Sequence, residues 1–403
     1  LMADPTATPE PTGNEPEMHA ETRIIRTGRR HQGSAVAPVL NPSTTHIAPS
    51  VAEGRRRATS TESPFFYGRY GNPTVNDFET AVAELEGAEA ARAFSSGMGA
   101  ISAVILGLCS QGDHVVAQRQ LFGGTALLFS NVCPRFGIDV TLVDAAEPGS
   151  FAAAVRPGKT MVVFAESPSN PQLALADLEE LGGIAGPMTV VDSTFATPLG
   201  QRPLDHGVDL VVHSATKTLA GHNDAMLGVV AGAQELIDWI WGFAVVQGAN
   251  ASPFDAMNGL RGLRTLAVRL ERQSRTAQLL AEALEGHEAV ATVRYPGLES
   301  HPQQDLAKRQ MAYMGGLLTF DLAGGLEAGS RFVQATRIAL LATSLGGPET
   351  LVTHPASTTH VGLDPAELEA AGITEGSIRV SVGLEHEQDV VADFLQALTV
   401  ATV

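Results

Sequence analysis

Lys217 is the residue of this sequence whose type and position best suit covalent chemistry. It ends an apolar run that begins at Val211, it follows the hydroxyl residues Ser214 and Thr216, and it precedes a turn-like segment at 221–224. An amine attacks a carbonyl only when it is deprotonated, and burial among apolar residues lowers the pKa of a lysine by destabilising its charge. The pattern therefore indicates a Schiff-base nucleophile with two hydroxyls beside it for a phosphate. A solvated loop lysine is the alternative.

Two further segments have residues suited to a charged ligand. Ser96, Gly97 and Met98 precede an apolar run of helical character at 100–108. Their backbone N–H groups are expected at a helix N-terminus, which attracts anions, and an ordinary N-cap is the alternative. Asp192 ends a β-rich run. Its carboxylate would either pair with the protonated ring nitrogen of a pyridine cofactor or cap the next segment.

Three other polar residues are candidates for binding a substrate or a phosphate. Asn170 lies in a proline-rich turn at 166–171 that follows an apolar run, and its amide could bind a cofactor ring oxygen or a substrate carboxylate. Arg379 interrupts an apolar β pattern and needs a partner, which is either a substrate carboxylate or an internal carboxylate. Arg69 lies in a Gly- and Pro-rich loop at 67–74, where it could hold a phosphate or be solvated.

The composition excludes several classes of function. The 403 residues include 26 basic and 44 acidic residues, and the formal charge of -18 argues against a nucleic-acid partner. Cys109 and Cys133 lack the spacing of a disulfide framework or a zinc site, which fits a reducing cytoplasm. His354 and His360 have no third ligand at a suitable spacing, so we expect no metal. No apolar stretch is long enough to span a membrane, and no secretion pattern is present.

The chain divides into four parts by pattern. Residues 1–21 have almost no large apolar groups, which predicts a disordered leader, and the irregular pattern of residues 22–72 predicts an extended arm that reaches a neighbouring subunit. Residues 73–265 alternate β-rich and helical runs, which predicts a large α/β domain with a mostly parallel sheet. Residues 266–403 begin with a long amphipathic helix and read as a smaller α+β domain. The expected strands are 114–117, 140–143, 161–165, 189–192 and 210–213.

In their order and combination these segments resemble the pyridoxal-phosphate enzymes of cysteine and methionine metabolism. That family includes cystathionine γ-synthase, cystathionine γ-lyase, methionine γ-lyase and O-succinylhomoserine sulfhydrylase, and the resemblance runs from about Thr22 to Leu398. It implies fold-type I architecture, with a seven-stranded type of sheet in the large domain and pyridoxal 5'-phosphate as cofactor. It also implies a homotetramer, a dimer of dimers whose active sites are shared between subunits, with an amino acid as substrate and a thiol or sulfide as a second reactant.

The same resemblance implies a role for each candidate residue. Lys217 carries the cofactor covalently and moves protons, and Asp192 pairs with the pyridinium. The residues implied for the phosphate of the same subunit are Ser96, Gly97, Met98, Ser214 and Thr216. Tyr67 and Arg69 reach the phosphate of the neighbouring subunit. The residues implied for the substrate carboxylate and its surroundings are Asn170, Thr343, Ser344 and Arg379.

Departures from the family pattern favour one reaction over another. Phe122 stands where many relatives have a tyrosine that stacks on the cofactor ring, so Tyr67 or Lys217 must deliver any proton to the leaving group. Gly124 replaces the reactive cysteine common in methionine γ-lyases, and Thr343 replaces a glutamate of cystathionine-handling relatives. The sequence therefore favours γ-replacement on an O-acylhomoserine. The alternative is a γ-lyase that releases 2-oxobutyrate, ammonia and a thiol, and a remote one is a catalytically weak cofactor-binding protein.

Overall fold

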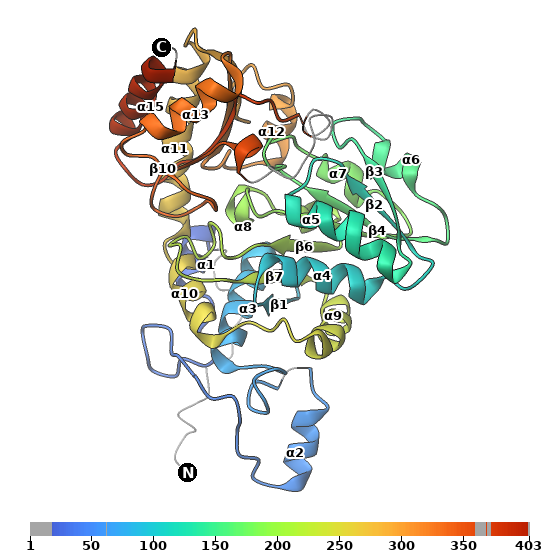
Figure 1. The fold of residues 1–403 in the computed structure, drawn as a ribbon. Helices are drawn as coiled ribbons and strands as arrows, with labels where there is room; N and C mark the ends of the chain where they lie inside the picture. Colours follow the sequence, from blue (N-terminus) through green and yellow to red (C-terminus); the bar gives the residue numbers. More distant parts are fainter. Residues whose placement is uncertain (1–17, 62, 359–367, 369–371, 402–403) are drawn as a thin grey trace.

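The computed structural model describes residues 18–61, 63–358, 368 and 372–401, and it contains two β-sheets with helices packed on them (Figure 1). The larger sheet has seven strands in the order β1-β7-β6-β5-β4-β2-β3. From β6 to β3 neighbouring strands are parallel, whereas β7 is antiparallel to both of its neighbours. This α/β architecture with a mostly parallel sheet confirms the predicted fold class.

The five strands expected from the sequence form the parallel part of this sheet. They are β2 (His114–Gln118), β3 (Asp139–Val143), β4 (Thr160–Glu166), β5 (Met188–Asp192) and β6 (Leu210–His213). Two further strands, β1 (Ala90–Phe94) and β7 (Gly228–Gly232), were not predicted. Three of the five residues of β1 are alanine, and three of the five residues of β7 are glycine or alanine. Such residues have low β-propensity, so the tertiary pairing of β7 with β1 and β6 decides the conformation of these segments.

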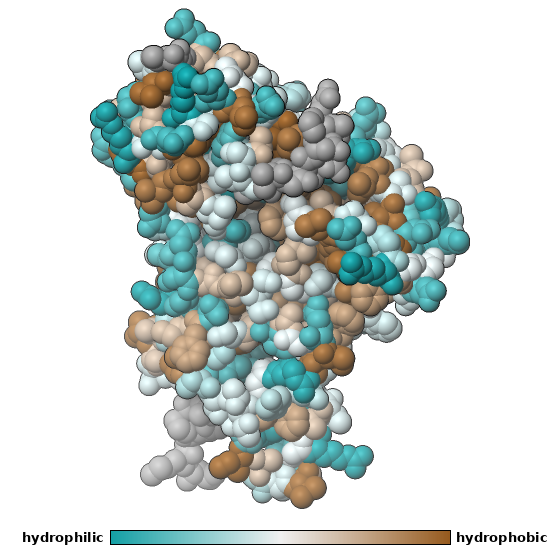
Figure 2. All heavy atoms as spheres, in the orientation of Figure 1, coloured by the Kyte–Doolittle hydropathy of each residue, from teal (hydrophilic) through white to brown (hydrophobic). Residues whose placement is uncertain are grey.

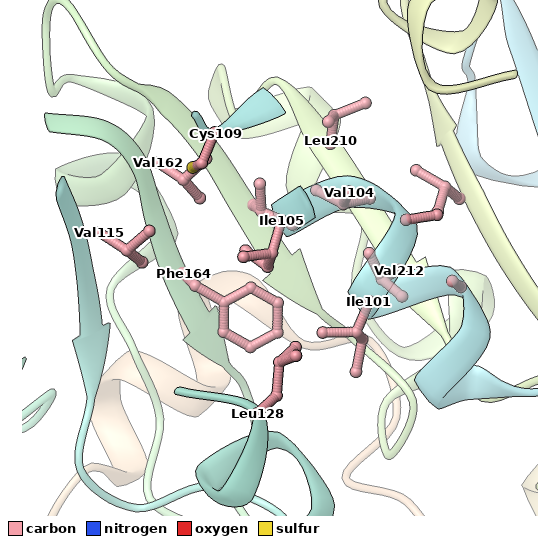
Figure 3. Packing of buried hydrophobic residues seen from close by; sticks show 14 of the residues in the cluster. Ile101, Val104, Ile105, Cys109, Val115, Leu128, Val162, Phe164, Leu210 and Val212 are labelled. Carbon is pink, nitrogen blue, oxygen red and sulfur yellow. The ribbon is translucent and has the colours of Figure 1, made fainter. Parts of the chain in front are cut away.

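Helix α4 (Gly97–Leu108) covers one face of the large sheet with an apolar surface. Figure 3 shows Ile101 and Ile105 of this helix next to Phe164 of β4 and Leu128, with Val104 on the same helix. All five side chains are at most 5% exposed. Burial of each such side chain stabilises the fold by roughly 1.5–3 kcal/mol, so this packing fixes the N-terminus of α4 relative to the strand ends.

The smaller sheet has five strands, in the order β10-β11-β12-β9-β8. Its members are β8 (Val290–Arg294), β9 (Leu317–Leu322), β10 (Leu340–Leu341), β11 (Leu351–Thr353) and β12 (Ser377–Ser381). The long amphipathic helix predicted after residue 265 is α11 (Leu266–Glu285), and it packs with α13 (Gly325–Ala335) and α15 (Glu387–Ala401) around a shared apolar core. An α+β unit therefore follows the large sheet.

After α1 (Ala20–Arg26), which packs against α3 (Pro73–Glu86), the N-terminal segment projects from the body of the molecule (Figure 1). The projecting part includes α2 (Val51–Ala58), which buries none of its residues. Ile47 and Val51 are more than nine-tenths exposed here, and apolar residues are visible on the projecting end in Figure 2. Of the leader expected at 1–21, residues 1–17 lie outside the described part of the chain. None of the helices in that described part is long and apolar enough to cross a membrane.

Candidate active site

A cavity of about 380 Å³ brings together residues from both sheets and the loops after their strands. The large sheet contributes the carboxyl ends of β4, β5 and β6, where an open α/β sheet exposes its ligand crevice. The smaller unit contributes the loop before β11 and the middle of β12. The lining residues that the sequence predicted are Ser96, Gly97, Met98, Phe122, Asn170, Asp192, Ser214, Thr216, Lys217, Thr343, Ser344 and Arg379.

Lys217 reaches into this cavity from the turn that follows β6. Its Nζ donates a hydrogen bond to Ser344 Oγ at 2.8 Å, which joins the large unit to the small one. Burial, and secondarily the positive charge of Arg379, lowers the pKa of Lys217 to about 8. A substantial fraction of the amine is therefore neutral at mildly alkaline pH, as a nucleophile requires.

The N-terminus of α4 meets the loop after β6 at Gly97. A Cβ atom on Gly97 would lie 2.7 Å from Ser214 Cβ and 2.9 Å from Ser214 Oγ, so only glycine lets the two segments approach this closely. Ser96 caps α4 by accepting the N–H of Gly99, and Thr216 Oγ1 bonds to the backbone of Leu227. The first-turn N–H groups and the Ser214 hydroxyl therefore form a small polar cradle suited to a phosphate.

Asp192 presents a carboxylate at the end of β5. Its Oδ1 accepts hydrogen bonds from the Thr194 N–H at 3.0 Å and the Thr194 hydroxyl at 2.5 Å. Among the described residues, the hydrogen bonds of the Asp192 carboxylate involve Oδ1 alone, which leaves Oδ2 for a ligand. Burial raises the pKa of Asp192, while the bonds from Thr194 and the charge of His213 act in the opposite direction. A cation in the cavity would be held by the ionised form.

Arg379 lies in the middle of β12 with its side chain almost fully buried. Its Nη1 donates to Asn170 Oδ1 at 3.2 Å and its Nη2 donates to the Ser344 carbonyl at 2.9 Å, while its buried Nε has no partner among the described residues. Burial lowers the pKa of Arg379 to about 10, and Glu166 opposes that change. Both hydrogen-bond acceptors are neutral oxygens that orient the guanidinium. The positive charge of Arg379 can therefore form an ion pair with a bound carboxylate.

Phe122 is half-exposed in the cavity wall, just before α5 (Gly123–Leu127). A Cβ atom on Gly124 would lie 2.7 Å from the Phe122 ring and 3.1 Å from the sulfur of Met98. The glycine at 124 and the phenylalanine at 122 are therefore matched in space: a larger residue at 124 would displace the ring.

Tyr67 and Arg69 do not line the cavity of their own chain. The Tyr67 side chain is 44% exposed, and Arg69 donates from Nη1 to the Val245 carbonyl at 2.6 Å. The Arg69 guanidinium also lies over the rings of Tyr67 and Tyr70, with centroid distances of 5.6 and 5.3 Å. Their role at the site of a neighbouring subunit stays a prediction.

Glu166 is a cavity residue that the sequence did not predict, and His354 is separate from the cavity lining. Glu166 ends β4 as Asp192 ends β5, and the two Cα atoms are partners in the sheet, so the rule that selected Asp192 could have found it. His354 is buried and bonds to Ser357 Oγ and the Glu375 carbonyl, which is a structural role. His360 lies outside the described residues.

The arrangement fits pyridoxal phosphate. A polar cradle at Gly97 and Ser214 suits the phosphate, the ionised Asp192 suits a protonated ring nitrogen, and Lys217 supplies the amine for the aldehyde. Phe122 supplies an aromatic surface in the wall of the same cavity. The cavity therefore has suitable groups for the phosphate, the ring nitrogen, the aldehyde and the aromatic face of that cofactor.

Comparisons with known proteins agree with this chemistry. The family model described as Cys/Met metabolism PLP-dependent enzyme matches residues 21–399. The L-methionine gamma-lyase of Porphyromonas gingivalis is 43% identical, over 94% of this chain and 96% of the relative. The O-succinylhomoserine sulfhydrylase of Pseudomonas aeruginosa is 41% identical, over 94% of each chain. The solved structure of cystathionine gamma synthase from Xanthomonas oryzae pv. oryzae has a TM-score of 0.89 and 37% identity, over 96% of this chain and 99% of that chain.

Proposed function

Because the chain belongs to the pyridoxal-phosphate-dependent enzymes of cysteine and methionine metabolism, we propose that its cavity catalyses elimination at the γ-carbon of a sulfur amino acid. The products would be a thiol, ammonia and a 2-oxo acid. The sequence favoured replacement on an O-acylhomoserine, but the relatives support the γ-lyase alternative somewhat better, since the methionine γ-lyase named above is the more similar of the two curated relatives. The family assignment also means that the cofactor expected from the sequence is confirmed.

The observation that supports this proposal is the position of Lys217 beside the carboxylate-binding group. Pyridoxal phosphate, when bound, acts as an electron sink for the substrate α-carbon. Arg379 and Asn170 would hold the substrate carboxylate, which fixes the rest of the amino acid relative to Lys217. Lys217 Nζ, about half of it neutral near pH 8, would remove the α-proton and then a β-proton, and loss of the β-proton lets the γ-substituent leave with the electrons of its bond to carbon.

Replacement on an O-acylhomoserine is the second candidate, and Phe122 favours it. The cavity wall has a phenyl ring at this position, which cannot donate a proton to a departing thiolate. An acyloxy group leaves as a carboxylate and needs less help from an acid. Thr343 offers no carboxylate for the distal amino group of cystathionine, so a smaller substrate is expected.

A substrate panel tests the proposal. Purified holoenzyme would be supplied with L-methionine alone, and separately with O-succinylhomoserine or O-acetylhomoserine plus sulfide or cysteine. We expect 2-oxobutyrate and methanethiol from methionine alone. Homocysteine from an acylhomoserine and sulfide, or cystathionine from an acylhomoserine and cysteine, with no release from methionine would assign the protein to replacement. A cofactor spectrum that no amino acid alters would assign it to binding without catalysis.

A further inference from the structure

Glu166 is a buried carboxylate at the centre of the cavity, and the proposed reaction does not use it. It is 4% exposed, and its Cα is paired with that of Asp192 on the neighbouring strand. Two carboxylates this close to each other and to an apolar core are unfavourable unless each is compensated by hydrogen bonds or cations. Glu166 is compensated by hydrogen bonds from two backbone N–H groups.

Each oxygen of Glu166 holds a different wall of the cavity. Oε2 accepts the backbone N–H of Phe122 at 2.8 Å, and Oε1 accepts the backbone N–H of Asn170 at 2.8 Å. The backbone of Glu166 is fixed as well, because the amide of Gln118 donates to its carbonyl at 2.8 Å and accepts its N–H at 3.0 Å. The side chain is therefore a rigid link between the loop before α5 and the turn after β4.

The link continues to the substrate side of the cavity through Asn170. The backbone of Asn170 donates to Glu166, while its side-chain Oδ1 accepts from Arg379 Nη1. The charge of Arg379 also favours the ionised form of Glu166, whereas burial and Asp192 raise the pKa of Glu166 well above its ordinary value. The carboxylate therefore stands between the aromatic wall and the guanidinium that would bind the substrate.

We propose that Glu166 is a positioning residue that holds Phe122 and the Asn170–Arg379 pair in one geometry, so that the cofactor ring and the substrate carboxylate are aligned together. It acts through its neighbours and does not exchange a proton with the substrate. The inference rests on the proposed function only in that the cavity binds pyridoxal phosphate and an α-amino acid. It holds for elimination and for replacement alike.

The substitution Glu166→Gln tests this role. It replaces one carboxyl oxygen, an acceptor, with an NH2 group that faces a backbone N–H, so one of the two walls loses its anchor. Binding of glycine, which has no γ-substituent to lose, would be followed by the change in cofactor absorbance. We expect full cofactor content, a glycine dissociation constant raised about tenfold, and weaker visible circular dichroism of the bound ring, because that signal depends on the asymmetry of its surroundings.

The matched control is Glu180→Gln, which alters a carboxylate that accepts the N–H of Gly149 at 2.9 Å outside the cavity. This variant should leave the glycine dissociation constant and the circular dichroism unchanged. If Glu166→Gln does not fold, Glu166→Asp keeps the carboxyl group on a side chain one methylene shorter and should still weaken glycine binding about threefold. Glycine binding and circular dichroism equal to wild type in the folded Glu166 variant would overturn the proposal. Glycine binding and circular dichroism do not depend on whether a γ-substituent is eliminated or replaced. The result of this test is therefore independent of the result of the substrate panel.

Discussion

At the scale of single residues, the properties of Lys217 depend on where it lies more than on its type. An exposed lysine is protonated at neutral pH, whereas burial and the nearby Arg379 lower the pKa of Lys217 to about 8. The lowered pKa means that the neutral, nucleophilic amine predominates above about pH 8 and the unreactive ammonium below it.

This titration predicts how the apoenzyme captures its cofactor. The rate constant for covalent capture of pyridoxal phosphate should rise with pH and be half-maximal near pH 8. Stopped-flow absorbance at saturating cofactor measures it. Arg379→Gln removes a positive neighbour, so the pKa of Lys217 should rise and the midpoint should move to higher pH. A midpoint that stays in place would show that burial alone sets this pKa.

Arg379 provides a second prediction at this scale. Removal of its guanidinium in Arg379→Ala should raise the KM for the amino-acid substrate by about 10- to 100-fold, which corresponds to one lost charge-assisted hydrogen-bonded pair. The effect on kcat should be smaller, because Lys217 and Asp192 remain in place. Steady-state kinetics with the substrate found active in the panel measures both constants. A fall in kcat with an unaltered KM would place the substrate carboxylate elsewhere.

At the scale of elements, the junctions between strands and helices bring the site together. Parallel neighbours β4, β5 and β6 end at the same edge of the sheet, and this places Glu166, Asp192 and Ser214 within one cavity. The apolar face of α4 fixes its N-terminus at the same edge. The close approach of α4 to the β6 loop requires the absence of a side chain at Gly97.

Gly97→Ala tests that requirement. The new methyl group would collide with Ser214, including its Cα at 2.9 Å, so helix and loop must separate and the affinity for pyridoxal phosphate should fall by about tenfold or more. Equilibrium titration of the apoenzyme measures it. Gly242→Ala is the control. Gly242 lies in α9 (Gln234–Gln247), and a Cβ atom there would meet nothing within 4 Å. This substitution should leave the cofactor affinity unchanged and raise the free energy of unfolding by up to about 1 kcal/mol, because alanine favours the helix more than glycine does. Equal cofactor affinity in the Gly97 variant would refute the close packing.

At the scale of the whole molecule, the cavity is built from both the large-sheet part and the small-sheet part of the chain. Two of the residues predicted to bind the cofactor do not line it. Ser344 and Arg379 come from the smaller unit, and the Lys217–Ser344 hydrogen bond spans the junction. Tyr67 and Arg69 lie outside the cavity of their own chain, at the base of the projecting arm. We propose that they complete the site of a neighbouring copy in a homo-oligomer.

Subunit complementation tests this sharing. Lys217→Ala and Arg69→Ala chains would each have low activity, but a mixed dimer contains one site with both native residues. Co-expression in equal amounts should therefore restore about a quarter of the wild-type activity. The control pairs Lys217→Ala with Arg379→Ala, whose altered residues line the same cavity, and no rescue is expected. Absence of rescue in the first pair would mean that Arg69 does not act across subunits.

Sequence alone determined the parallel strands 114–117, 140–143, 161–165, 189–192 and 210–213, the helix after residue 265 and the family, because apolar periodicity and local motifs are properties of short segments. It also identified Lys217 and Asp192 as chemically suited residues. It missed β1 and β7, which have small residues and depend on their neighbours for pairing.

Only the tertiary structure decided how these residues act on one another. The contact of Glu166 with Phe122 joins residues 44 positions apart, and Arg379 reaches Asn170 across 209 residues. Burial, which lowers the pKa of Lys217, likewise exists only in the folded chain. Interactions of this kind depend on distances between remote parts of the chain, and no local pattern of residues specifies such distances.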